Sequence, residues 1–107
     1  MEPPYKAVEF IIENSAKYAE AKAKRIYISE FRKSKKALLF ANAIGNTIAD
    51  KENYAYSHPE YIEVLDDLKK AVAVAEKLRW MLVASQARID VYRTQEASNR
   101  NIDRSTQ

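Results

Sequence analysis

The feature that most constrains this chain is the long stretch after Pro59, which contains neither proline nor glycine. Ser57 and Glu60 stand three residues apart, which is the spacing of a reciprocal N-terminal capping pair. Pro59 falls in the first turn, where its missing N–H has no structural consequence. Apolar residues then recur at steps of three and four, with Ser85 as the polar exception. This second stripe comprises Leu65, Leu68, Val72, Ala75, Leu78, Leu82, Ile89 and Tyr92. The spacing predicts one helix over residues 58–95.

The N-terminal half has the same character. Pro4 can occupy the first turn of a helix, and no breaker follows before Gly45, so we expect a helix over residues 4–44. The first stripe, expected to face the partner helix, comprises Ile12, Ala16, Ala19, Ala23, Tyr27, Phe31, Leu38 and Ala41. The weak point is Asn14-Ser15, since both side chains compete for backbone hydrogen bonds. A break there would give three helices.

The two helices are joined by residues 45–57. Gly45 directly follows the first stripe, which is the usual position for a left-handed residue that ends a helix. Thr47 and Asp50 have the spacing of a cap for one further helical turn. Beyond the second helix, residues 96–107 are polar and have little to bury, so they are expected either to continue as a solvated helix or to fray.

The sequence thus predicts an all-α fold, a long antiparallel helical hairpin in a single domain of 107 residues. A turn centred near residue 51 would bring Lys35 and Lys36 to Asp67 and Asp66. Both helices also carry apolar residues outside the two stripes, among them Trp80. A second hairpin would cover them, so we expect a homodimer that forms a four-helix bundle.

Composition excludes several classes of protein. Without cysteine the chain has neither disulfides nor thiolate metal sites, and its apolar runs are too short to cross a bilayer. The N-terminus does not resemble a signal peptide. These features predict a soluble protein without membrane contact, located in the cytoplasm.

Charge is distributed unevenly. Residues 17–36 contain eight basic side chains but only two acidic ones, whereas residues 50–67 contain six acidic side chains and one basic one. A basic helical face of this kind can lie along phosphates. The candidate nucleic-acid-binding residues are Lys22, Arg25, Arg32, Lys33 and Lys36. The alternative is that the end of this segment near the turn pairs with residues 60–67 and that the rest is ordinary surface.

No residue set indicates catalysis. His58, the only histidine, has neither a second histidine nor a cysteine to form a metal or nucleophile site with it, and it is expected to be a solvated cap residue. Glu60, Glu63 and Asp67 share a helical face that can hold a divalent cation or form a solvated acidic surface. We therefore expect no enzyme activity, no catalytic or metal site and no cofactor.

Arg79 and Trp80 are the candidate protein interface, because Trp and Arg dominate the energetics of many interfaces. The alternative for Trp80 is a place in the bundle core.

Three segments carry a resemblance to a known group of proteins. They are residues 30–39 (EFRKSKKALL), residues 57–61 (SHPEY) and residues 79–100, from RWMLVASQARI to RTQEASNR. Together they are similar to small uncharacterised helical proteins of bacteriophages and prophages over most of residues 17–104. The resemblance implies an early-region phage protein in the bacterial cytoplasm, encoded near replication or recombination genes. It implies no particular activity.

Charge pattern and resemblance together predict a non-catalytic, self-associating protein that assists phage DNA metabolism in recombination or replication. It would do so by binding DNA or a DNA-handling protein. The alternative is a protein-interaction module that inhibits a host or defence protein. A third reading, an enzyme, would need a bound metal or cofactor that the sequence does not predict.

Overall fold

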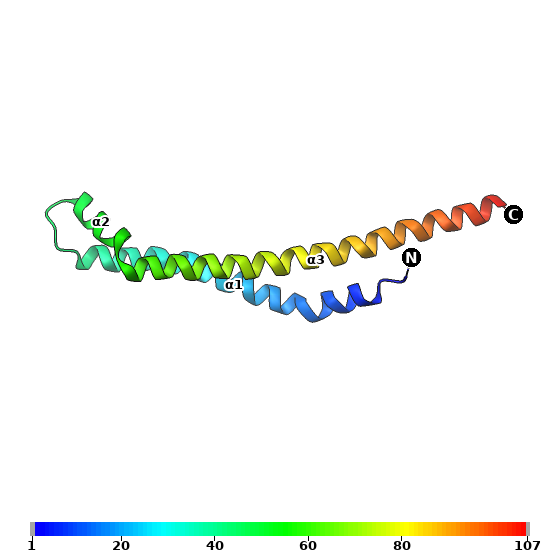
Figure 1. Ribbon diagram of the computed structural model, residues 1–107, viewed down its shortest axis with the longest axis horizontal. Helices are drawn as coiled ribbons and strands as arrows, with labels where there is room; N and C mark the ends of the chain where they lie inside the picture. Colours follow the sequence, from blue (N-terminus) through cyan, green and yellow to red (C-terminus); the bar gives the residue numbers. More distant parts are fainter. Residues whose placement is uncertain (1, 107) are drawn as a thin grey trace. The chain divides into compact units, whose positions relative to one another are not determined.

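The computed structural model describes residues 2–106, which form three helices and no strand (Figure 1). Helix α1 spans Tyr5–Asn42, α2 spans Ile48–Ser57 and α3 spans Pro59–Thr106. The all-α prediction is confirmed. The chain divides into two compact units. We call Ala19–Glu76 the turn unit, and Met1–Tyr18 together with Lys77–Gln107 the terminal unit.

Helix α1 is continuous through the predicted weak point. The side-chain amide of Asn14 donates to the Phe10 carbonyl at 2.9 Å, and the Ser15 hydroxyl donates to the Ile11 carbonyl. Both side chains bond to the turn before them and so do not divert the backbone. The predicted alternative of a break at these residues is therefore wrong.

The connection contains a ten-residue helix where the sequence indicated one turn. The Thr47 hydroxyl caps α2 by accepting a hydrogen bond from the Asp50 N–H at 3.1 Å, so the predicted cap is confirmed. The role predicted for Gly45 is wrong, because its φ is not positive. The small size of Gly45 matters instead, because a Cβ at this position would lie 3.0 Å from the Asp50 Cβ.

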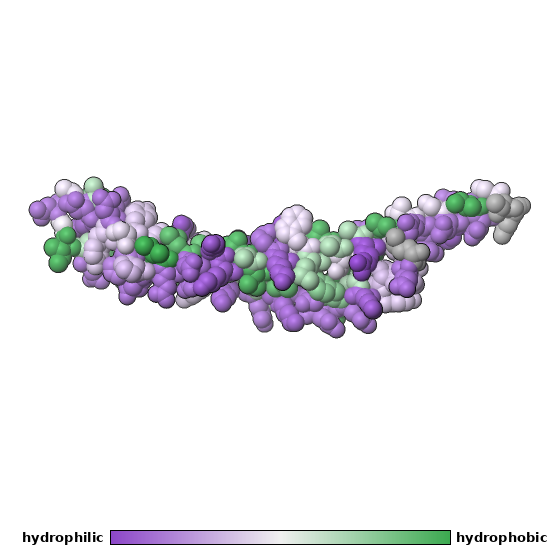
Figure 2. Space-filling model, viewed as in Figure 1, coloured by the Kyte–Doolittle hydropathy of each residue, from purple (hydrophilic) through white to green (hydrophobic). Residues whose placement is uncertain are grey.

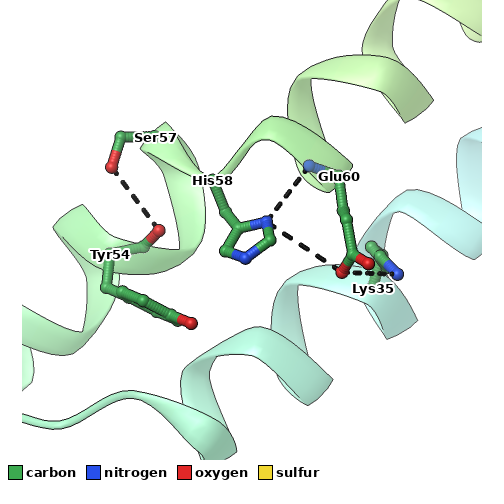
Figure 3. A network of polar contacts seen from close by, with 5 residues as sticks. All are labelled: Lys35, Tyr54, Ser57, His58 and Glu60. Atoms are coloured by element: carbon green, nitrogen blue, oxygen red, sulfur yellow. Dashed lines mark hydrogen bonds and ion pairs between the residues drawn. The ribbon is translucent and has the colours of Figure 1, made fainter.

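Helix α3 begins at Pro59, one residue after the predicted start, and its cap is His58 and not Ser57 (Figure 3). The Nδ1 atom of His58 accepts from the Glu60 N–H at 3.1 Å, while Ser57 ends α2 and donates to the Asn53 carbonyl at 2.6 Å. At the other end α3 continues to Thr106, so the polar tail predicted for residues 96–107 is helical up to that residue. Gln107 lies outside the described residues.

The turn unit has a small core where α2 meets the other two helices. Leu39, Ala55 and Tyr61 are buried together, with Phe40 packed against them. The Tyr56 ring meets the Tyr61 ring edge to face, with centroids 5.5 Å apart. Each helix of the unit contributes at least one residue, so this cluster ties the three together.

Pairing between α1 and α3 in the turn unit differs from the prediction by one heptad. Lys35 contacts Glu60 at 3.1 Å, in place of the predicted Asp67 (Figure 3). The prediction assumed a symmetrical loop centred near residue 51. Because α2 takes up most of that connection, α3 begins beside an earlier part of α1. Further along, Ala21 and Ile28 of α1 line the same groove as Asp67 and Val74 of α3, so the two helices still lie side by side there. Figure 1 shows that they run antiparallel in the turn unit.

The side of α1 that faces α3 is not the first stripe. In the turn unit Arg25, Ile28, Arg32 and Leu39 are half-buried or buried, whereas the turn-unit members of the first stripe are exposed. The prediction failed because α1 is apolar on two sides, and because arginine stems can cover apolar surface as well as aliphatic residues do. The Arg32 Nε is buried without a hydrogen-bond partner in the part of the chain that the structure describes.

In α3 the second stripe is largely correct. Ala75 is buried, and Leu68, Leu78, Leu82, Ile89 and Tyr92 are half-buried. Leu65 and Val72 are exposed, and Tyr61, Val64 and Ala71 take their places at a heptad spacing. In the terminal unit, among the described residues, only Ala7 is buried, and residues 97–105 are exposed on every side of α3.

Candidate functional site

The structure separates the five basic residues predicted to form one nucleic-acid-binding face. Arg25 and Arg32 are half-buried on the side of α1 that faces α3. Lys33 forms an ion pair with Glu30 at 3.3 Å, and Lys36 bonds to Tyr56. Lys22 is exposed. These residues therefore do not present a single row of free cations, and their binding to phosphates remains a prediction.

Among the three lysines of this set, Lys36 has the most constrained ammonium group. Its Nζ donates to the Tyr56 hydroxyl and lies 4.2 Å from the centroid of the Tyr56 ring. This hydrogen bond to Tyr56 raises the pKa of Lys36 above its ordinary value. This contact uses Lys36 to hold α2 against α1, which is a structural role.

A groove between α1 and α3 in the turn unit, the turn groove, has an apolar floor and a charged rim. Its volume is about 330 Å³. The floor is formed by Ala21, Ile28, Ala71 and Val74, and the rim by Lys24, Lys70 and Asp67. Lys70 also pairs with Asp66 at 3.4 Å. The small alanines leave the groove open, and one lysine from each helix stands beside it.

The terminal unit has a groove of similar kind, the terminal groove, of about 340 Å³. It is lined by Lys6, Ala7, Phe10, Met81, Ala84, Ser85 and Arg88. A neighbouring hollow shares Lys6 and Arg88 and adds the segment from Glu2 to Tyr5. Here too a cation from each helix stands beside apolar surface.

Both grooves suit a group that combines negative charge with an apolar part, such as an acidic side chain next to an apolar one on a partner. The binding residues predicted from the sequence did not include Lys6, Lys24 or Lys70. In the sequence these lysines do not stand out from the other basic residues. Each comes to lie beside a cation of the other helix only because α1 pairs with α3. Assigning heptad positions to both helices would have placed these lysines next to the residues at which the helices meet.

A third surface is an exposed side of α1 in the turn unit, next to the side that faces α3, which we call the outer face of α1. It comprises Ala19, Ala23, Tyr27, Phe31, Leu38 and Ala41, all of them exposed. Tyr27 and Phe31 stack with ring centroids 6.1 Å apart and planes 12° apart. The surface coloured by hydropathy likewise shows apolar patches between polar ones (Figure 2). This face has no covering element in the turn unit.

The predicted interface pair lies in α3 of the terminal unit. The Arg79 guanidinium carbon is 4.8 Å from the centroid of the Trp80 ring, which is a cation–π contact. Trp80 is 58% exposed, so it does not belong to the core of this chain. Its role as an interface anchor remains a prediction.

The acidic residues do not form a metal site in the described part of the chain, where no group of three or more potential ligands is close enough to bind an ion. Glu60 instead bonds to Lys35 and lies 4.0 Å from the His58 Nδ1 (Figure 3). Among the described residues, no helix has a segment both long and apolar enough to span a bilayer.

In comparisons with known proteins, no family model, no curated protein and no solved structure matches this chain.

Proposed function

We propose that this chain is a non-catalytic interaction protein that self-associates and binds a protein partner through its helix faces. One observation carries the proposal: the large apolar side chains lie mostly outside. Leu39, Tyr61 and Val64 are the only large apolar residues buried in the described chain. Tyr27, Leu38 and Trp80 each keep more than half of their surface exposed. Exposed apolar residues that are grouped in this way are typical of interaction surfaces.

The resemblance to early-region phage proteins supplies the proposed setting. In a bacterial host the partner would be a DNA-handling protein of replication or recombination. The alternative is a host or defence protein that the chain inhibits. Both readings use the same surfaces, and both are compatible with the apolar grooves flanked by cations in the turn and terminal units.

Self-association is tested by light scattering coupled to size exclusion, over a hundredfold range of concentration. We expect twice the 12.3 kDa mass of the chain. A constant mass of one chain at the highest concentration would overturn self-association. For the partner, capture from host lysate treated with nuclease should yield one protein in a fixed ratio to the bait. Capture that disappears with nuclease would argue for nucleic acid.

Direct DNA binding is a second candidate, favoured by the paired cations Lys24 with Lys70 and Lys6 with Arg88. Contacts with phosphates release counterions, so affinity must fall steeply as salt rises. The double variant Lys24→Gln, Lys70→Gln should weaken binding and flatten this salt dependence. Lys33→Gln is the control, because Lys33 does not line the turn groove. An unchanged affinity in the double variant would exclude the turn groove as the DNA contact.

A further inference from the structure

We infer that a second copy of this chain docks on the outer face of α1 in the turn unit, with the two α1 helices antiparallel and a twofold axis close to Tyr27. This inference rests on the proposed self-association and names the surface that would carry it.

Burial shows that α1 has two apolar sides in the turn unit but only one neighbour. Ile28 and Leu39 face α3 and the core, and they are half-buried or buried. Tyr27 and Leu38, one residue earlier in each case, are 68% and 60% exposed. At about 100° per residue, successive positions of a helix point to different sides. The intrachain packing thus leaves an unfilled apolar side.

The bulk of the outer face is graded along the helix. Ala19 and Ala23 lie before Tyr27, while Phe31 and Leu38 follow it. In an antiparallel pair about Tyr27, the Ala23 of one copy stands opposite the Phe31 of the other, so a large side chain meets a small one. A parallel pair would set the large residues against each other and the alanines against each other. The helices could then not keep an even separation.

The area of the face is consistent with a modest dimer. A fully buried aromatic residue removes about 150–250 Å² from water. From their exposed fractions, Tyr27, Phe31 and Leu38 of two copies contribute about half of the roughly 1,200 Å² that a small specific interface buries. The exposed alanines and Ile26 can supply further area. Tyr27 and Phe31 are already stacked, so they lose little side-chain freedom on binding.

The test exploits the absence of cysteine from the chain. Ala23→Cys and Phe31→Cys chains are prepared separately, mixed at equal amounts and oxidised gently. We expect the disulfide-linked dimer to form at least tenfold faster in the mixture than in either variant alone. The exposed α2 variant Asn53→Cys, mixed with Ala23→Cys, measures random collision. Rapid linkage of Ala23→Cys to itself would overturn the antiparallel arrangement.

A second variant tests the face without relying on cross-links. Tyr27→Glu combined with Phe31→Glu adds charge at exposed positions, so helix content by circular dichroism should stay unchanged while the mass falls to one chain. The same change at Ile62 and Leu65, exposed residues of α3 outside the turn groove, is the control and should leave the mass at two chains. If the first variant remains dimeric, this face is not the interface, although self-association stands. If the unaltered chain is itself monomeric, the proposed function fails first.

Discussion

The turn unit and the terminal unit are built from the same two long helices, yet they are held together differently. In the turn unit α2 adds a third element, and six buried side chains lie within it, from Leu39 to Ala75. It also contains the Lys35–Glu60 ion pair between helices and the contact of Tyr56 with Tyr61. In the described terminal unit only Ala7 is buried. The two long helices are better packed where a third helix covers apolar side chains that the pair alone would leave exposed.

This difference indicates where stability resides. Local stability follows the density of buried apolar contacts, so the backbone amides of the turn unit should be better protected from hydrogen exchange than those of the terminal unit. The exposed surfaces also differ between the two units. In the terminal unit, Trp80 is exposed and Phe10 lines the terminal groove, while few residues are buried beneath them. Such a surface suits a region whose apolar side chains are covered by a bound partner.

The largest effect should come from the core of the turn unit. Tyr61→Ala removes a side chain that is 5% exposed and packs against Tyr56, Leu39 and Ala55. We expect a loss of about 3 kcal/mol in the free energy of unfolding, measured with urea. Tyr5→Ala, at a residue that is 74% exposed in the terminal unit, should change it by less than about 0.5 kcal/mol. Equal losses would remove the distinction between the units.

The same substitution placed in both units sharpens the comparison. Ala75→Glu forces a carboxylate into a site that is 3% exposed in the turn unit, at a cost of about 2 kcal/mol. Ala7→Glu also places a carboxylate at a buried position, which is 4% exposed. Ala7 lies in the first turn of α1, where the helix can fray and a negative charge is favourable. The loss in the free energy of unfolding should therefore stay below about 1 kcal/mol. Denaturation with urea measures both, and a reversed order would contradict the comparison.

The contribution of α2 can be isolated through its cap. Thr47→Ala removes the oxygen that accepts from the Asp50 N–H and should cost about 1 kcal/mol. Thr47→Ser keeps that oxygen and is the matched control, with a cost of a few tenths of a kcal/mol. Thermal unfolding followed by circular dichroism compares them. If both variants unfold like the unaltered chain, the cap does not support the turn unit.

The smallest effect concerns the ammonium group of Lys36. Because its folded pKa is raised above the ordinary 10.5, the contact favours folding below that value and is lost as the pH rises through the folded pKa. Tyr56→Phe keeps the ring and removes the hydroxyl, so the pKa of Lys36 should fall back toward 10.5. An NMR titration of the lysine side chains measures this, with Tyr54→Phe as control. A value unchanged by Tyr56→Phe would show that the hydroxyl is not the cause.

Much of the local structure was predictable because its signals are short in range. Thr47 with Asp50, and Pro59 in a first turn, mark helix starts through contacts within four residues. The candidate surfaces were less predictable. Arg25 and Arg32 look like free cations in the sequence, but both are half-buried in the fold. The grooves beside Lys24 and Lys6 combine residues of two helices, so they exist only once the helices pair.

The sequence by itself determined that this chain is helical, because proline and glycine are confined to helix starts and to the connection, and because α3 repeats its apolar residues at a heptad spacing. The tertiary structure alone decided which side of α1 meets α3 and in what register. Two sides of α1 are apolar enough to pack, and their difference in free energy depends on neighbours that periodicity does not specify. The length of α2 sets where α3 begins beside α1, and the packing of these two helices leaves Tyr27 and Phe31 exposed.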